Sequence, residues 1–188
     1  QQVRSGAHGI DVSVGFAGRD EQKDTKEVMG RYVQKILLPL MPDTTQVPSL
    51  ECALKLIGAK PIINSVNLED GIEKFDKVCS LAKRFGAALV CLTIDEVGMA
   101  KSKAQKVAIA ERIYTLATQK HGIHPEDLVF DLLTFTVGSG DLEYHTAAIE
   151  TIEAIREFHA RHPEVGFVLG ISNISFGLAK HAREYLNS

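Results

Sequence analysis

Short apolar runs recur six times along the 188 residues, and a segment with helical periodicity follows nearly every one of them. The runs span residues 8–15, 39–43, 60–67, 87–95, 128–135 and 165–173. The first alternates like a half-buried strand, while most of the others are continuously apolar, as in parallel strands that are buried on both faces. The alternation therefore predicts an α/β fold with a parallel sheet and helical cover.

The segments between the runs carry apolar residues at helical spacing. They predict helices at about 21–37, 49–57, 70–85, 102–121, 143–161 and 179–186. Gly58, Gly86 and Gly122 close three of these segments, and Pro163 stops the fifth, as expected of helix ends. Because no linker, low-complexity run or composition break interrupts the six units, we expect one domain over residues 1–188.

A lone polar residue stands at the end of five apolar runs. These residues are Asp43, Asn64, Asp95, Asp131 and Asn173. An open sheet usually gathers its ligand groups at one switch point, whereas here they are spread over nearly every strand end. This spread favours a TIM-type (β/α)8 barrel, in which all strand ends meet on one face. Such a barrel takes about 250 residues, so a chain with six units is expected to form an incomplete one.

Composition excludes several classes of partner. The 21 basic and 24 acidic side chains give a net charge of −3, which offers no general attraction to nucleic acid or to an anionic membrane. The apolar runs stop at about eight residues, short of the roughly 20 that span a bilayer. The amino terminus lacks the apolar block of a signal peptide, so we expect a cytoplasmic location. The three cysteines are widely spaced without a CxxC motif, and no metal site is expected.

Other familiar site chemistries find little support. Gly138, Ser139 and Gly140 precede a helical segment, but no GxGxxG or GxxxxGK[ST] motif occurs, and a flexible loop explains them better than a phosphate cradle. The seven histidines include no HExxH motif, and Ser172 lies beside Asn173 without a nearby base. A phosphate-handling barrel lyase or isomerase remains an alternative that depends on the 138–140 loop.

The five strand-end residues suit one kind of ligand. Asp and Asn also cap helices and form Asx turns, which explains any one of them about as well as a binding role. Taken together they offer several acceptors and two amides, with no Lys or Arg at these positions. Such a lining fits a neutral, flat, amide-rich heterocycle, such as the aminopyrimidinone edge of a pterin, better than a phosphate.

The order of the strand-end motifs carries a family resemblance. The segments GAHGIDVSVG, LMPDTT, KPIINSVNLEDG, CLTIDEVGMA, LVFDLLTF and LGISNISFGL occur in succession over residues 1–188. In this the chain resembles the pterin-binding domain of cobalamin-dependent methionine synthase. The resemblance implies that residues 1–188 are a pterin-binding barrel domain whose first and last β/α units are missing. Dihydropteroate synthase and the corrinoid-protein methyltransferases belong to the same wider group and remain alternatives.

Residue roles follow from the resemblance. It implies that Asp43, Asn64 and Asp131 hydrogen-bond the pterin ring and that Asn173 lies near N5 of that ring. Asp11 and Asp95 would be secondary members of the same pocket. Asn173 and Asp43 would be the catalytic pair, with Asp43 in a proton network and Asn173 stabilising protonated N5.

The resemblance also implies a reaction. The methyl group on N5 of 5-methyltetrahydrofolate would pass to cob(I)alamin on a partner module, which then methylates homocysteine on another module. No metal is required in this chain, and any zinc would lie in the homocysteine module outside it. The alternative from another class is a folate-binding fragment without catalytic activity.

Overall fold

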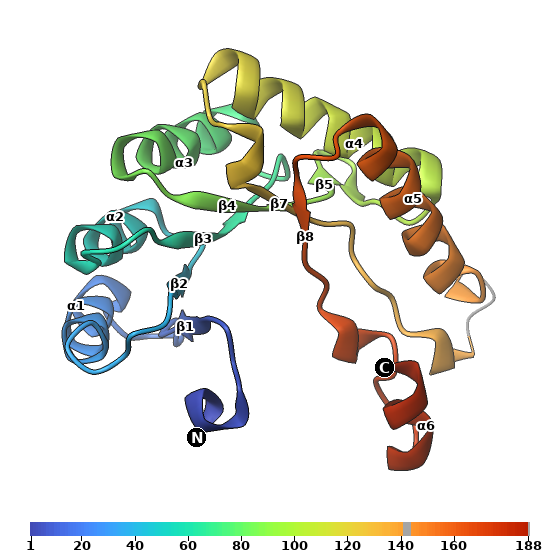
Figure 1. The fold of residues 1–188 in the computed structure, drawn as a ribbon, viewed down its shortest axis with the longest axis horizontal. Coiled ribbons are helices and arrows are strands. Elements are labelled where there is room, and N and C mark those ends of the chain that lie inside the picture. Colours follow the sequence, from blue (N-terminus) through green and yellow to red (C-terminus); the bar gives the residue numbers. More distant parts are fainter. Residues whose placement is uncertain (141–143, 188) are drawn as a thin grey trace.

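The computed structural model describes residues 1–140 and 144–187. Six strands form one parallel sheet in consecutive order, which confirms the predicted strand arrangement (Figure 1). The strands are β1 (Ile10–Ser13), β2 (Leu40–Asp43), β3 (Ile62–Val66), β4 (Ala88–Leu92), β7 (Leu128–Asp131) and β8 (Gly166–Phe167). The sheet curves into an arc whose edge strands β1 and β8 do not meet, so the barrel is incomplete, as expected.

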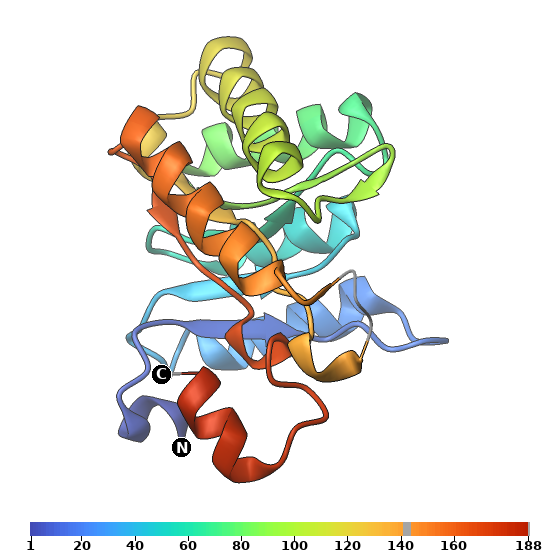
Figure 2. The same cartoon turned by 90° about the vertical axis from the view of Figure 1, so that its right-hand side faces the viewer.

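Helices cover the convex side of the arc. They are α1 (Glu21–Tyr32), α2 (Val47–Leu56), α3 (Ile72–Phe85), α4 (Lys103–Thr115) and α5 (Ala147–Arg161), and a further helix, α6 (Lys180–Leu186), follows β8. A π-helical stretch, Leu116–Lys120, extends α4, and short 3₁₀ turns lie at Gln2–Ser5, Pro125–Asp127, Val137–Ser139 and Ile171–Asn173. Figure 2 shows that α6 lies at the far end of the molecule from α4, away from the helices that pack on the sheet.

Burial alternates along β1, β2 and β7 and identifies which of their side chains face the concave side. In β1 the buried residues Ile10 and Val12 pack with Met29 of α1 and Ala53 of α2. The residues between them must then point away from the helices. The same alternation places the last residue of β2 and of β7 on the concave side, because the residue before each of them is buried against helices. In these three strands one face packs under helices and the other faces the concave side, whereas in β4 Leu89, Val90 and Cys91 are all buried, so both faces of β4 are covered, as its apolar character predicted.

A larger apolar core fills the space between the sheet and helices α3, α4 and α5. Phe75, Phe130 and Phe158 are fully buried at its centre, and the rings of Phe130 and Phe158 meet edge to face with centroids 4.7 Å apart. This core holds β4 and β7 at the middle of the arc. It therefore fixes the strand ends that follow them, where the polar residues lie.

Three predicted strands end earlier in the structure than in the sequence prediction. The run 87–95 ends its sheet pairing at Leu92, and a separate antiparallel hairpin follows, formed by β5 (Ile94–Asp95) and β6 (Gly98–Met99). The run 165–173 forms a strand only at Gly166–Phe167, because the chain leaves the edge of the sheet and turns at Gly170. The run 128–135 likewise ends at Asp131. The predicted helix 21–37 ends at Tyr32, and of the predicted helix 143–161 residue 143 lies outside the described residues.

A capping box begins α4. The Ser102 hydroxyl accepts a hydrogen bond from the Gln105 amide at 3.3 Å, and the Gln105 side chain accepts one from the Ser102 amide at 3.1 Å. These bonds satisfy two backbone donors that the first helical turn leaves free. They set where α4 starts after the hairpin.

We expect Ser102→Ala to lower the free energy of unfolding by about 1 kcal/mol, because an N-cap hydroxyl is lost. Urea denaturation of the full-length protein measures this. Ser80→Ala is the matched control, since the Ser80 hydroxyl only bonds back to Asp76 O within α3 and alanine favours a helix interior. Equal destabilisation by both changes would contradict the capping role.

Within the described residues, no helix is both long enough and apolar enough to span a bilayer.

Candidate functional site

Three of the predicted site residues lie together on neighbouring strands at the concave face. In the sheet register Asp43 of β2 is level with Ser13 of β1 and with Asn64 of β3. The Asn64 side-chain amide donates to Asp11 Oδ1 at 3.4 Å, which links β3 to β1 across β2. We refer to Asp11, Asp43 and Asn64 as the acid–amide cluster.

The acid–amide cluster shifts the protonation of Asp43. Burial raises the pKa of the Asp43 carboxyl above its ordinary value, and the Asp11 carboxylate raises it further. A hydrogen bond from Ser13 opposes this rise, while Glu21 adds to it. Asp43 therefore holds a proton more readily than an exposed aspartate does.

Asp131 ends β7 on the same concave side, further round the arc. Its Oδ1 accepts a hydrogen bond from the Leu133 amide at 2.8 Å, and the Gly170 backbone also donates to its carboxylate. Burial raises the pKa of Asp131, whereas these backbone bonds and the nearby Lys106 ammonium lower it. Asp131 thus joins the loop after β7 to the loop after β8 and retains acceptor capacity, since a carboxylate offers about four lone-pair sites.

Lys106, in the first turn of α4, is a residue near the site that sequence reasoning missed. Its side chain is fully buried, and its ammonium donates to the carbonyls of Ala100, Leu132 and Leu133. The sequence does contain a signal for its burial, because Lys106 falls on the apolar stripe of Ile109, Ala110 and Ile113, at spacings of three, four and seven residues. A charged residue on an otherwise buried stripe is a signal that a partner is present.

Asp95 does not lie with the acid–amide cluster. Its Oδ1 accepts hydrogen bonds from the amides of Val97 at 2.9 Å and Gly98 at 3.3 Å, which close the turn between β5 and β6. The residue lines a hollow between this hairpin and α4, together with Gln105 and Ile109. Its carboxylate therefore has a local structural role, and a role in ligand binding stays a prediction.

Asn173 lies in the loop after β8, not at a strand end. It ends the 3₁₀ turn Ile171–Asn173 and is exposed. Its carbonyl accepts a hydrogen bond from the Thr136 hydroxyl at 2.9 Å, and Gly170 O accepts one from the Thr134 hydroxyl at 2.7 Å. These bonds hold the loop after β8 against the loop after β7. Among the described residues no hydrogen bond engages the Asn173 side-chain amide, which stays available to a ligand.

The 138–140 loop does not lead directly into a helix. Val137–Ser139 form a 3₁₀ turn, and α5 starts only at Ala147. A side-chain carbon placed on Gly138 would come within 2.4 Å of Leu178, so this glycine is required for close packing against the segment before α6. The packing explains the glycine and gives no support to a phosphate cradle.

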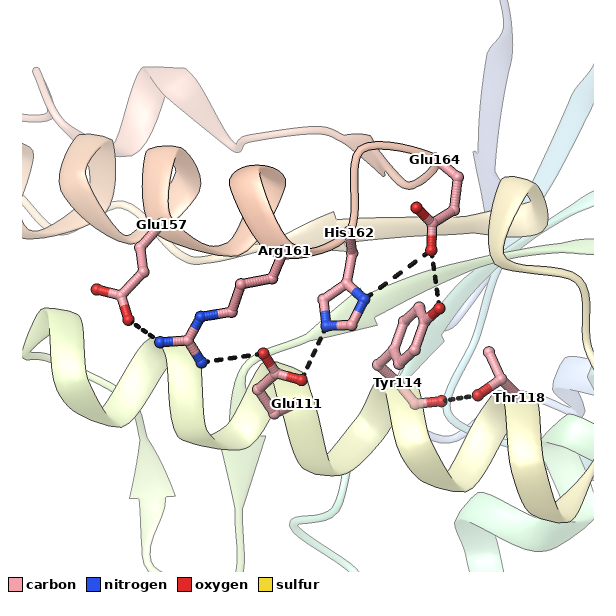
Figure 3. Close-up of polar contacts among 7 residues, drawn as sticks. All are labelled: Glu111, Tyr114, Thr118, Glu157, Arg161, His162 and Glu164. Atoms are coloured by element: carbon pink, nitrogen blue, oxygen red, sulfur yellow. Dashed lines mark hydrogen bonds and ion pairs between the residues drawn. The ribbon is translucent and has the colours of Figure 1, made fainter.

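A separate polar network lies at the opposite end of the strands (Figure 3). His162 Nε2 lies 2.9 Å from Glu111 Oε2, and the Tyr114 hydroxyl donates to Glu164 at 2.8 Å. The Tyr114 and His162 rings are in contact at a tilt of 34°, with centroids 3.9 Å apart. These hydrogen bonds join α4 to the end of α5 and hold the two helices together. The network has a structural role and is separate from the acid–amide cluster.

The sequence pattern of the family described as "Pterin binding enzyme" matches residues 1–188. The chain belongs to this family. The match confirms the resemblance inferred from the strand-end motifs. The acid–amide cluster lies at the carboxyl ends of the strands, which is where TIM-type barrels bind their ligands. Within the described part of the pterin-binding chain, no group of three His, Cys, Asp or Glu side chains is placed to hold a metal ion.

Two curated relatives are similar over the whole chain. The methionine synthase of Mycobacterium leprae is 44% identical over 190 residues, and that of Mycobacterium tuberculosis is 45% identical over 190 residues. Each alignment covers 100% of this chain and 16% of the relative. The pterin-binding chain therefore spans about a sixth of the length of these two proteins.

Solved structures share the fold at low sequence identity. Dihydropteroate synthase of Vibrio fischeri superposes with a TM-score of 0.62 at 16% identity, covering 89% of this chain and 61% of the other. The Yersinia pestis enzyme, solved with a pterine-sulfa conjugate, gives 0.60 at 15% identity, covering 91% and 64%. At this identity the likeness establishes the fold alone, and it confirms the TIM-type barrel architecture.

Proposed function

We propose that residues 1–188 form a pterin-binding domain that binds 5-methyltetrahydrofolate and, in the full-length protein, passes its N5 methyl group to cobalamin on a partner module. The methyl group then reaches homocysteine, as in methionine formation. The observation that carries this proposal is the acid–amide cluster at adjacent strand ends. The similarity of residues 1–188 to a part of two methionine synthases favours this reaction over the other pterin chemistries.

Ring recognition rests on complementary hydrogen bonding. The aminopyrimidinone edge of a pterin presents N–H donors beside a carbonyl acceptor. Asp43 and Asp131 supply carboxylate acceptors, and Asn64 supplies an amide that both donates and accepts. The Asn64 amide nitrogen already donates to Asp11, so the Asn64 side-chain oxygen would be the acceptor for a donor on the ligand. Phosphate binding would need cationic donors, and this cluster has none.

Proton supply to N5 is the chemical requirement of the reaction. A tertiary amine leaves poorly unless its nitrogen gains a proton or a strong hydrogen bond as the C–N bond breaks. The raised pKa of Asp43 makes it the cluster's best candidate to hold that proton, directly or through a water molecule. Asn173 has no titratable proton, but its amide can accept a hydrogen bond from protonated N5 and so favour the charged transition state.

The partner modules supply the remaining chemistry. Bound cobalamin would provide the cobalt centre that accepts the methyl group, and a homocysteine module would provide the final acceptor. The residues of this chain would bind and orient the folate and hold the proton at N5. Any zinc would belong to the homocysteine module, since no step assigned to this chain requires a metal.

The test is a single-turnover assay of the full-length protein with 5-methyltetrahydrofolate, cob(I)alamin and no homocysteine. We expect the absorbance of methylcobalamin to appear in step with demethylation of the folate. Folate binding without transfer would instead support the non-catalytic alternative. Failure to bind the folate would reject the proposal as a whole.

A further inference from the structure

Lys106 is a buried cation without a role in the proposed chemistry. It lies in the first turn of α4 with its side chain fully removed from solvent. Three backbone carbonyls surround its ammonium, at 3.1 Å for Ala100 and 3.1 Å for Leu133, with Leu132 closer still. The face of the Phe135 ring lies 5.0 Å from the same nitrogen. This arrangement satisfies the charge, which a buried ammonium requires.

The three carbonyls belong to two loops at the carboxyl ends of neighbouring strands. Ala100 follows the β5–β6 hairpin, while Leu132 and Leu133 follow Asp131 directly. Lys106 therefore braces the hairpin loop against the loop that carries Asp131. Leu133 adopts a φ of 62°, which is rare for a residue with a side chain, and its carbonyl also accepts a hydrogen bond from Thr151 of α5 at 2.9 Å. Two donors from two helices thus hold the backbone just after Asp131.

Packing alone does not call for an ammonium at this position. An apolar side chain of similar volume would fill this position and avoid the cost of removing a charge from water, but it would leave the three carbonyls without the Lys106 donor. The charged groups that face the Lys106 nitrogen are Asp131 of β7 and Glu150 of α5. Burial lowers the pKa of Lys106 to about 8, and both carboxylates oppose this change. At neutral pH the group is therefore mostly charged, and it lowers the pKa of Asp131 in turn.

We propose that Lys106 is a positioning residue for the pterin site, which fixes the loop after β7 by its three carbonyl contacts and places a positive charge near the Asp131 carboxylate. This inference rests on the proposed function, in which Asp131 accepts hydrogen bonds from the pterin ring. Its consequence is a pH dependence of folate affinity that Lys106 controls without touching the folate.

The direction in which the midpoint of folate affinity moves follows from the pKa changes of Asp131 and Lys106. Asp131 accepts the ring N–H groups only when ionised, so affinity falls as pH drops through its pKa. Removal of the Lys106 charge takes away an influence that lowers this pKa, and the midpoint moves to higher pH. Above about pH 8 Lys106 loses its own proton, so its charge no longer acts on Asp131 and only the loss of its carbonyl contacts should separate the wild type from an uncharged variant.

The experiment measures the dissociation constant of 5-methyltetrahydrofolate from pH 5 to 9 for the full-length wild type, Lys106→Met and Lys106→Gln. We expect both variants to move the midpoint of the affinity loss upward by about one pH unit, so that the affinity becomes up to about tenfold weaker at pH values below both midpoints. Lys106→Gln keeps a donor for the carbonyls, so it serves where Lys106→Met does not fold. Lys106→Arg, which keeps the charge, should restore the wild-type midpoint.

Thr151→Val is the matched control, because it removes an uncharged donor to the same Leu133 carbonyl. It should weaken binding by the same factor at every pH without moving the midpoint. A wild-type midpoint in both Lys106→Met and Lys106→Gln would overturn the inference, provided that Asp131→Ala loses affinity. If Asp131→Ala binds as the wild type does, the proposed function fails instead.

Discussion

Asn173→Ala should slow methyl transfer by about 10²-fold or more at saturating folate, because a hydrogen bond that strengthens in the transition state is removed. The dissociation constant of 5-methyltetrahydrofolate should change much less, since N5 is not yet protonated in the ground state. Single-turnover transfer rates in the full-length protein, compared with separately measured binding, distinguish the two effects. The Asn173 amide is exposed in the loop after β8, so its removal should leave the fold intact.

Ser172→Ala is the control for this change, because Ser172 is exposed in the same 3₁₀ turn and has no assigned role. It should transfer methyl at the wild-type rate. If Asn173→Ala also does so, Asn173 has only a binding or structural role, and the catalytic role passes to Asp43 or to another residue.

Alanine at Asp43, Asn64 or Asp131 should weaken folate binding by roughly 10- to 100-fold each, because a buried or charge-assisted hydrogen bond is worth about 1.5 to 3 kcal/mol. Calorimetric titration of the full-length variants measures the loss directly. Asp11→Ala should have a smaller effect, since the Asp11 carboxylate acts through its 3.4 Å contact with Asn64.

Asp127→Ala provides a charge-matched control for Asp131→Ala. Asp127 lies just before the first residue of β7, at the opposite end of the strand, and forms an ion pair with Lys60. Its loss should leave folate affinity unchanged. Wild-type folate affinity in the alanine variants of Asp43, Asn64 and Asp131 would reject the assignment of these three residues to pterin binding.

The order of the strands could be predicted because apolar runs and helical stripes alternate without interruption. The inward direction of Asp43 and Asp131 followed from the same pattern, since each stands beyond a buried residue at the end of a strand. The hydrophobic pattern could not predict how far the edge strand β8 pairs with its neighbour. The run 165–173 is apolar enough for a full strand, but β8 pairs only with β7 and leaves the sheet before Gly170.

Asp95 and Lys106 show two further limits. A run of apolar residues that ends in Asp predicts a strand end, yet local hydrogen bonding in the Asp95–Gly98 turn diverts the chain into a hairpin. An Asx turn competes here with continued strand pairing. The hydrophobic pattern of the sequence does not show which of the two is favoured. Lys106 was missed because lysine is treated as a surface residue, although its place on the buried stripe of α4 marks it as an exception.

The most direct test is a crystal structure of the full-length protein with 5-methyltetrahydrofolate bound. The account predicts that the pterin ring lies on the concave face at the carboxyl ends of the strands, within hydrogen-bond distance of Asp43, Asn64 and Asp131, with N5 toward Asn173. A ring bound elsewhere, such as beside the 138–140 loop or in the hollow between the β5–β6 hairpin and α4, would contradict it.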